Sequence, residues 1–322
     1  MFHRLAIAAL AAACLLAPSF AGAQAYPNKT IRFIVPFAPG GGNDILGRVV
    51  ALKLNEAFRV PVVVDNRPGA GGTLGTDLTV KAQPDGYTIL INNLSVAVNV
   101  TLYSKLPFDP LKNLQTISLV GRQPNILVVH PTLPVNSWKE LYALAKQRPG
   151  QLTFSSGGIG SSSHLAGELL KVVAGIDMVH IPYKGMGPAL IDLISGEVQL
   201  SMSTLASALP HIRNKRMRAL AVSTAQRVAV VPDVPTLKEA GLTAYEHSTW
   251  YGLFVPAGTP RPVVDRLNET VRKVVASADV KQKFGPQGVE PDSNTPEEFR
   301  ALLTSEIAKW AKVVRAAGLK AN

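Results

Sequence analysis

A glycine-rich turn joins an apolar strand to an amphipathic helix near the start of the chain, in the stretch FIVPFAPGGGNDILGRVV at residues 33–50. The preceding run TIRFIV is β-rich, and apolar residues at 45, 46, 49, 50, 52 and 54 recur on one side of a helix. Strand-to-helix units of this kind build parallel sheets that are covered by helices. The unit therefore points to the α/β class.

The same alternation continues along the chain. Further strands are predicted at VPVVVDN, TILINN, NILVVH, LTFSS, DMVHIPY, EVQLSMS and RALAVST, and helices at residues 44–58, 73–82 and 186–195. The pattern restarts near Gln123, and a chain of 322 residues exceeds what one core usually holds. We predict two lobes, each a doubly wound, mostly parallel sheet, joined by crossing strands near residues 125–130 and 246–254.

Residues 1–25 are predicted to be an export signal. A short basic start is followed by an apolar run at residues 5–17, and Ala23-Gln24-Ala25 fits signal-peptidase cleavage. The run is shorter than the roughly 20 residues needed to span a bilayer. Cys14 is the only cysteine, and the weak likeness of Ala11–Cys14 to a lipoprotein box is outweighed by the apolar residues that follow. We expect a soluble, exported protein without disulfides.

The formal net charge of +11 raises the question of nucleic-acid binding. Lys and Arg are scattered along the chain, however, and the one local cluster, HIRNKRMR at residues 211–218, has no interleaved aromatic residues. We interpret this cluster as a solvated helix end and strand start. No nucleic-acid partner is expected.

A second glycine-rich stretch, LTFSSGGIGSSSHLAGELLKVV at residues 152–173, repeats the plan of strand, loop and helix in the second lobe. The first N–H groups of a helix have no partner within it, and the helix dipole places partial positive charge there. Glycine allows a ligand to approach the backbone without meeting a Cβ. Two such loops, one per lobe, are suited to holding an anion between them.

Known catalytic and nucleotide-binding motifs do not fit these loops. Residues 42–48 lack the Lys-Ser/Thr pair of a P-loop, and Leu74 and Ser163 stand where the dinucleotide fingerprint needs its third glycine. His164 replaces the second glycine of a hydrolase elbow. The remaining histidines show no metal-like spacing, so we predict no catalytic residue, no metal and no cofactor.

Several side chains near the loops are open to two interpretations. Asp44 is better explained as a first-turn acid of its helix than as a ligand contact. His164 either donates a hydrogen bond to a ligand as a neutral ring or caps its helix. Tyr183, in PYKGMGP, either lines the cleft or belongs to a tight connection, and Ser203 and Thr204 follow a strand from which hydroxyls can reach a ligand.

In these residues the chain resembles the substrate-binding proteins of tripartite tricarboxylate transporters, the Bug family of periplasmic receptors. The resemblance runs from about Tyr26 to the C-terminus. Its motifs are YPNKTIRFIVPFAPGGGNDILGR, VVVDNRPGAGGTLG, PDGYTIL, LTFSSGGIGSSSHLAGELL, PYKGMGPALIDLISGEVQL, RALAVST, VPTLKEAGL and WYGLFVPAGTP. Their order and spacing make the combination specific.

The resemblance implies a type II periplasmic binding protein, with lobe 1 at residues 26–125 and 247–322 and lobe 2 at residues 126–246. It implies a receptor that closes around a dicarboxylate, tricarboxylate, acidic amino acid or aromatic acid and delivers it to membrane permease subunits. We expect the protein to be a monomer. The expected ligand-binding residues are Ala38, Pro39, Gly40, Gly41, Gly42, Asn43, Asp44, Gly158, Gly160, Ser161, Ser162, Ser163, His164, Tyr183, Ser203 and Thr204. A ligand-sensing adaptor for a membrane kinase, or an exported α/β enzyme, remains an alternative.

Overall fold

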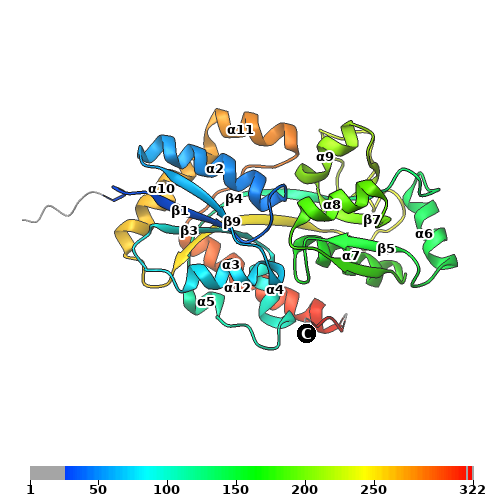
Figure 1. Ribbon diagram of the computed structural model, residues 1–322, viewed down its shortest axis with the longest axis horizontal. Helices are drawn as coiled ribbons and strands as arrows, with labels where there is room; N and C mark the ends of the chain where they lie inside the picture. Colours follow the sequence, from blue (N-terminus) through cyan, green and yellow to red (C-terminus); the bar gives the residue numbers. More distant parts are fainter. Residues whose placement is uncertain (1–25, 317, 321–322) are drawn as a thin grey trace, which may run out of the picture.

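Strands and helices alternate along the chain in the computed structural model, which describes residues 26–316 and 318–320 (Figure 1). The expected export signal lies outside these residues. The strands are β1 (Ile31–Val35), β2 (Val62–Asn66), β3 (Thr88–Asn93), β4 (Leu114–Val129), β5 (Thr153–Ser156), β6 (Val179–Pro182), β7 (Leu200–Thr204), β8 (Arg218–Val222) and β9 (Ser248–Pro256). The helices are α2 (Gly42–Phe58), α3 (Thr73–Val80), α4 (Ser95–Leu102), α5 (Pro110–Asn113), α6 (Trp138–Gln147), α7 (Ser162–Ala174), α8 (Met186–Ser195), α9 (Leu205–Arg213), α10 (Arg261–Ala276), α11 (Ala278–Phe284) and α12 (Pro296–Ala316).

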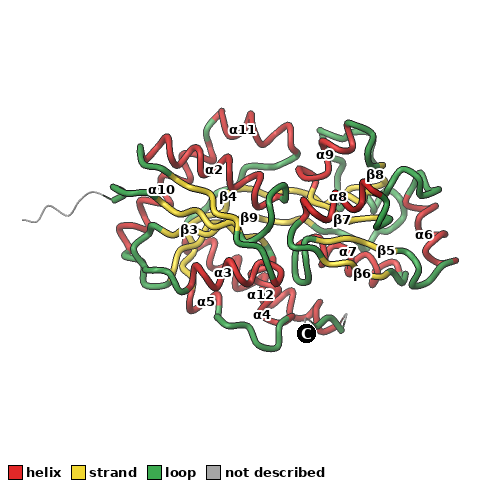
Figure 2. Tube along the Cα trace, viewed as in Figure 1, coloured by secondary structure: helices red, strands yellow, loops and turns green. Residues whose placement is uncertain are grey.

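The strands form two five-stranded halves that share β4. Lobe 1 has the strand order β2-β1-β3-β9-β4, and lobe 2 continues from β4 through β7, β5 and β6, with β8 on the other side of β4. Within each lobe the strands that carry the glycine loops pair in parallel: β1 with β2 and β3, and β5 with β6 and β7. Helices cover both faces of both halves (Figure 2). The predicted two-lobed, doubly wound architecture is confirmed.

The crossing strands join the lobes and are antiparallel to their neighbours. The first part of β4, Leu114–Pro124, pairs with β9, and the part from Asn125 onward pairs with β7 and β8. The chain returns through His247 into β9, whose first residue Ser248 pairs with Pro124. The strand predicted at NILVVH is thus the second half of a strand that begins at Leu114. Gln123 and Pro124 interrupt the apolar pattern of β4 at the crossing point. The sequence pattern therefore did not predict the first half of this strand.

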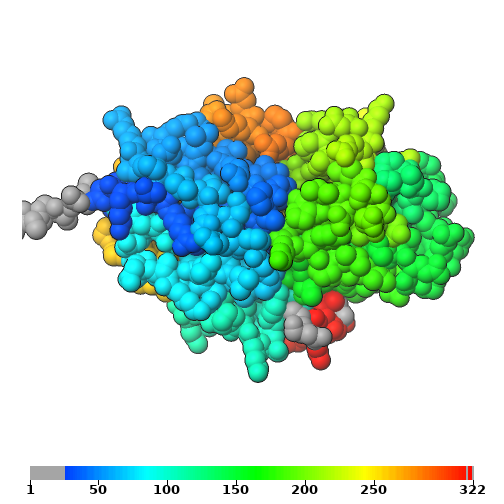
Figure 3. Space-filling view, viewed as in Figure 1, coloured from blue at the N-terminus to red at the C-terminus, as the bar shows by residue number. Residues whose placement is uncertain are grey.

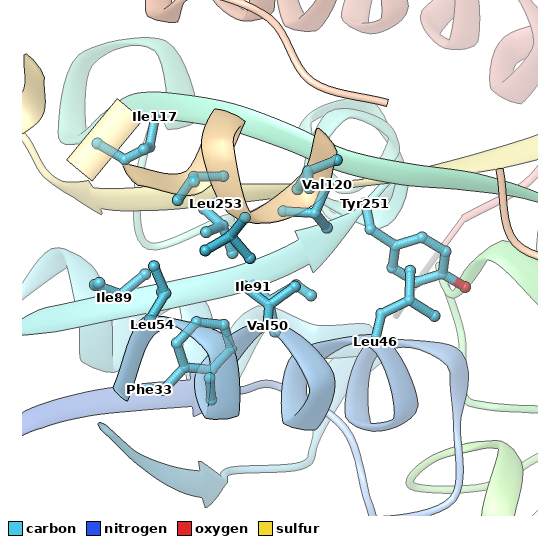
Figure 4. Close-up of a cluster of buried hydrophobic side chains, with 14 of the residues drawn as sticks. Phe33, Leu46, Val50, Leu54, Ile89, Ile91, Ile117, Val120, Tyr251 and Leu253 are labelled. Atoms are coloured by element: carbon cyan, nitrogen blue, oxygen red, sulfur yellow. The ribbon is translucent and has the colours of Figure 1, made fainter. Parts of the chain in front are cut away.

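Lobe 1 has one apolar core on each face of its sheet. Ile31, Phe33 and Val35 of β1 face α2 and α10, whereas Ile34 faces α4 and α12. The first of these cores contains Leu46 of α2 and Tyr251 of β9, which lies at its edge (Figure 4). Burial on both faces explains why β1 has no polar alternation.

Lobe 2 is built in the same way. Leu127 and Phe154 pack with α6 and α7 on one face, and Ile126 packs with α8 and α9 on the other. Burial of apolar area stabilises each face by about 25 cal/mol per Å². No helix among the described residues is long and apolar enough to cross a membrane.

The helix predictions agree with the structure for α2, α3 and α8 to within two residues. Helix α4, with the sequence SVAVNVTL, was not predicted, because β-branched residues at every second position favour a strand. Its buried residues pack against α12, and this tertiary contact outweighs local propensity.

Candidate ligand-binding site

A small cavity lies where the two lobes meet. Its volume is about 20 Å³, which is room for one water-sized group. It is lined by Phe37, Gly41, Gly42, Asn43, Asn93, Gly157, Ser161, Ser162, Ser163, Met186, Thr204 and Tyr251. Both glycine loops contribute to this wall, so the structure brings the two predicted loops together on one cavity.

Helix starts surround the cavity. Helices α2, α7 and α8 begin at Gly42, Ser162 and Met186, and α9 begins directly after Thr204. Each helix carries about half a positive charge at its N-terminus, together with N–H groups that have no carbonyl partner within the helix. Among the lining residues, all in the described part of the chain, none is charged. The cavity therefore combines positive potential with neutral hydrogen-bond donors.

Asp44, in the first turn of α2, holds the first loop in place through hydrogen bonds of its carboxylate. Its Oδ2 accepts a hydrogen bond from the Gly40 amide at 3.0 Å, and its Oδ1 accepts one from Asn66 Nδ2 at 3.0 Å. Arg48 forms an ion pair with the same carboxylate at 2.9 Å. Because these partners occupy both oxygens, Asp44 holds the loop in shape, in keeping with the interpretation as a first-turn acid.

Asn43 differs from Asp44 because its side-chain oxygen has no partner among the described residues. The residue is only 4% exposed and lines the cavity. A buried polar atom without a hydrogen bond is costly unless a ligand or water supplies one. This oxygen is therefore available to accept a hydrogen bond from a water or a ligand donor in the cavity.

The serines of the second loop are partly engaged with one another. Ser163 Oγ accepts a hydrogen bond from the Gly157 amide at 2.9 Å, and Ser161 Oγ lies 3.1 Å from it. Ser162 Oγ lies 3.4 Å from Nε2 of the buried His247. Ser161 Oγ also accepts a hydrogen bond from the His164 amide at 3.3 Å. These contacts fix the loop, and they leave the amides of Ser162 and Ser163, the first two residues of α7, without a partner within the helix.

His164 caps its loop and lies outside the cavity wall. Its Nδ1 accepts a hydrogen bond from the Gly160 amide at 3.2 Å, and its ring packs at 4.2 Å on the ring of His180. Burial, with a smaller contribution from Lys171, lowers the pKa of His164 to about 4. Of the two roles left open by the sequence, the geometry favours the cap formed by a neutral ring.

The remaining predicted residues occupy different positions. Thr204 lines the cavity, whereas the buried Ser203 donates its hydroxyl to the Thr204 carbonyl and does not reach the wall. The Tyr183 hydroxyl donates to Asp192 at 2.7 Å, and burial followed by this hydrogen bond raises the pKa of Tyr183 to about 12. Gly158 and Tyr183 line a larger outer groove of about 600 Å³ at the cleft mouth.

The lobes are in contact across this boundary, where the two surfaces meet in Figure 3. The Ala38 amide of lobe 1 donates to the Lys184 carbonyl of lobe 2 at 3.0 Å, and Tyr103 Oη donates to the Ile159 carbonyl at 3.2 Å. A Cβ on Gly187 would overlap the Pro39 carbonyl, and one on Gly160 would overlap the Asn99 side chain. Ala38, Pro39 and Gly160 thus lie in the contact between the two lobes and allow the lobes to approach each other closely.

Several lining residues were not identified from the sequence. Phe37 lies two residues beyond the end of β1, Asn93 is the last residue of β3, and Met186 is the first residue of α8. Position relative to the predicted elements could therefore have indicated them. Tyr251 lies in the middle of β9, where nothing in WYGLFVP separates it from the core residues beside it. In the described ranges no three His, Asp or Glu side chains gather as a metal ion would require.

Two lobes, two crossing strands and a polar interlobe cavity define a solute-binding protein of the periplasmic type. The model of the tripartite tricarboxylate transporter family receptor matches residues 46–319. The chain belongs to this receptor family. The family resemblance inferred from the motifs is confirmed, and so is the expectation of a binding protein in place of an enzyme.

Individual relatives agree with this assignment. Protein BugT of Bordetella pertussis is 39% identical over 97% of this chain and 95% of its own length. The solved structure of R. palustris Rpa4515 with adipate is 34% identical, with a TM-score of 0.89 over 92% of this chain and 99% of that one. The structure of the periplasmic binding protein BugD is 32% identical, with a TM-score of 0.88 over the same shares.

Asp44→Ala is expected to lower the free energy of unfolding by about 1–3 kcal/mol, because it leaves the Gly40 amide and Asn66 without their buried acceptor. Urea unfolding measures this loss. Asp265→Ala is the matched control, since its ion pair with Arg261 is exposed and is expected to contribute at most about 1 kcal/mol. Lost ligand affinity at unchanged stability would instead make Asp44 a ligand contact.

Stability is expected to fall as the pH drops from about 6.5 towards 4. Burial, with a smaller effect of Lys309, lowers the pKa of His247 to about 4, so the unfolded chain binds a proton in this window that the folded chain does not. One such histidine contributes a slope of about 1.4 kcal/mol per pH unit. Urea unfolding at pH 7, 6 and 5 should give a shallower slope for His247→Gln than for the parent chain. Equal slopes would contradict the assignment.

Proposed function

We propose that the chain is a periplasmic receptor that binds a carboxylate group of a small organic acid in the interlobe cavity. It closes its lobes around this ligand and delivers it to the membrane permease subunits of a tripartite tricarboxylate-type transporter. The observation that carries the proposal is the convergence of helix starts from both lobes on one uncharged, donor-rich cavity.

A carboxylate suits this cavity for electrostatic reasons. The first-turn amides of α2 and α7 can donate to its oxygens from opposite lobes, and the helix dipoles favour its negative charge. Hydrogen bonds from neutral donors to an ionised acceptor are stronger than those to a neutral one. The adipate named for the similar Rpa4515 structure supports a carboxylate as the bound group.

The cavity volume limits what the inner site can hold. About 20 Å³ accommodates one small polar group, while the remainder of an acid needs other space. The outer groove, which shares Gly157 with the cavity and is also lined by Tyr103 and Lys184, offers that space. Dicarboxylates, tricarboxylates, acidic amino acids and aromatic acids are all candidate ligands on this basis.

Closure follows from contacts that a ligand makes with both lobes at once. A ligand held by α2 and α7 together stabilises the arrangement in which their first turns face each other. Its differential affinity for this arrangement shifts the population towards the closed form. The closed form then presents a surface to the permease that the open form lacks.

Thermal unfolding with a panel of acids tests the receptor function. The protein should first be unfolded and refolded to release any retained ligand, and then titrated with adipate, malate, citrate, glutamate and benzoate. At least one acid is expected to raise the melting temperature with dose, as mass action requires. A flat response to every acid at saturating concentration would refute carboxylate binding.

Gly41→Val is expected to abolish acid binding while the fold is retained. Gly41 has a φ of −86°, which valine adopts freely, and a Cβ there would lie 3.6 Å from the Met186 amide of the other lobe. The two further methyl groups would enter the cleft and hold the lobes apart. Calorimetric titration measures the loss, with Gly41→Ala as the matched variant that should retain most of the affinity. Full affinity in Gly41→Val would contradict the assigned site.

A further inference from the structure

Tyr251 places a hydroxyl at the cavity from within the core of lobe 1. The residue is fully buried, and its ring packs in the same cluster as Leu46 and Leu253, with the oxygen directed away from the cluster (Figure 4). A Cβ on Gly42 would overlap this oxygen, so the hydroxyl lies against the first residue of α2. Tyr251 also lines the cavity wall.

Gln123 determines which way this hydroxyl is oriented. Its Oε1 accepts a hydrogen bond from the Ala206 amide at 3.1 Å, and its Nε2 donates to Tyr251 Oη. A backbone N–H can only donate, so the oxygen of the Gln123 amide must face Ala206 and its NH₂ must face Tyr251. The phenol oxygen is thereby fixed as an acceptor, and its own proton needs another partner.

Two acceptors can receive the phenol proton. One is the hydroxyl of Thr204, which lines the same cavity and interacts with Ser207 Oγ at 2.8 Å, and the other is a ligand oxygen in the cavity. Burial raises the pKa of Tyr251, so the phenol keeps its proton at any physiological pH. An ionised carboxylate is a stronger acceptor than a hydroxyl, and it therefore takes the proton's hydrogen bond when it is present.

We propose that Tyr251 is a ligand-contacting residue that donates its phenolic hydrogen bond to a carboxylate oxygen, and that Gln123 is the positioning residue that orients it. This inference rests on the proposed function and adds a side-chain donor to the backbone donors of the two loops. It also gives the site a preference: the phenolic proton, together with the positive potential of the helix starts, favours a hydrogen-bond acceptor beside Tyr251 over an ammonium group. The Ala206–Gln123–Tyr251 series connects α9 of lobe 2 to the cavity through both crossing strands.

The test compares affinities of refolded protein for adipate, malate and hexanoate by calorimetry. Tyr251→Phe is expected to weaken binding by about tenfold or more, as loss of a hydrogen bond to a charged group does. The factor should be similar for each acid that binds the parent chain, because the carboxylate is the one polar group that all three acids have in common. A change confined to one acid would overturn the assignment of Tyr251 to the common carboxylate.

Two further variants separate ligand contact from structural damage. Tyr245→Phe removes another buried phenol, whose hydroxyl donates to the Ala166 carbonyl at 2.9 Å in the core of lobe 2, and it should leave affinity unchanged. Gln123→Met keeps the phenol but removes its orientation, so its loss of affinity should be smaller than that of Tyr251→Phe. If Tyr251→Phe does not fold, as judged by circular dichroism, the loss of affinity in Gln123→Met carries the test.

The outcomes are distinguishable from failure of the receptor function. If the parent chain binds these acids and Tyr251→Phe binds them equally well, the inference fails and the receptor function stands. Equal losses in Tyr251→Phe and Tyr245→Phe would mark the effect as structural and also overturn it. If the parent chain binds no acid, the proposed function itself fails, and the role of Tyr251 fails with it.

Discussion

The antiparallel ladder between β4 and β9 is the interaction on which the site depends. Strand β4 runs for 16 residues, about 50 Å at the usual rise, and belongs to the sheets of both lobes. In each lobe the parallel strands that precede the glycine loops end at the boundary, so their loops and the following helix starts meet there. Ligands in open α/β sheets bind beyond the carboxyl ends of strands, and here two such ends face each other.

The uncharged lining of the cavity connects binding to closure. When the lobes meet, first-turn amides at the cavity lose access to bulk water, and each buried polar group left without a partner costs about 1–3 kcal/mol. A carboxylate supplies acceptors for the amides, whereas an empty closed cavity does not. The same groups that bind the ligand therefore disfavour closure without it. A lysine or arginine in the wall would bind an anion to one lobe alone and weaken this coupling.

The sequence predicted those parts of the fold and site that depend on local pattern. Hydrophobic periodicity located α2 and α8, and the glycine-rich turns located both loops of the cavity. Helix α4 and the first half of β4 were missed, because packing on α12 and pairing with β9 determine them. The same limit applies to Tyr251 and Gln123, which come together although 128 residues separate them in the sequence. Their contact depends on the register of the crossing strands, which no local pattern encodes.

The glycines of these loops allow the two lobes to approach each other, and they also allow a ligand to approach the backbone. A Cβ on Gly71 would overlap the Ile159 carbonyl and separate the lobes. A Cβ on Gly40 would lie 3.4 Å from the Gly187 Cα, and the φ of +86° at Gly40 also favours glycine. Gly41 is different, because a Cβ there would lie 3.6 Å from the Met186 amide, an ordinary contact distance, and its φ is −86°. Thus the run Gly40-Gly41-Gly42 combines three constraints: approach to lobe 2, access to the ligand, and contact with the Tyr251 hydroxyl. The same three residues therefore contact lobe 2, line the ligand cavity and contact the crossing strand β9 through Tyr251. This explains why a strand-to-helix turn without reactive side chains forms so large a part of the site.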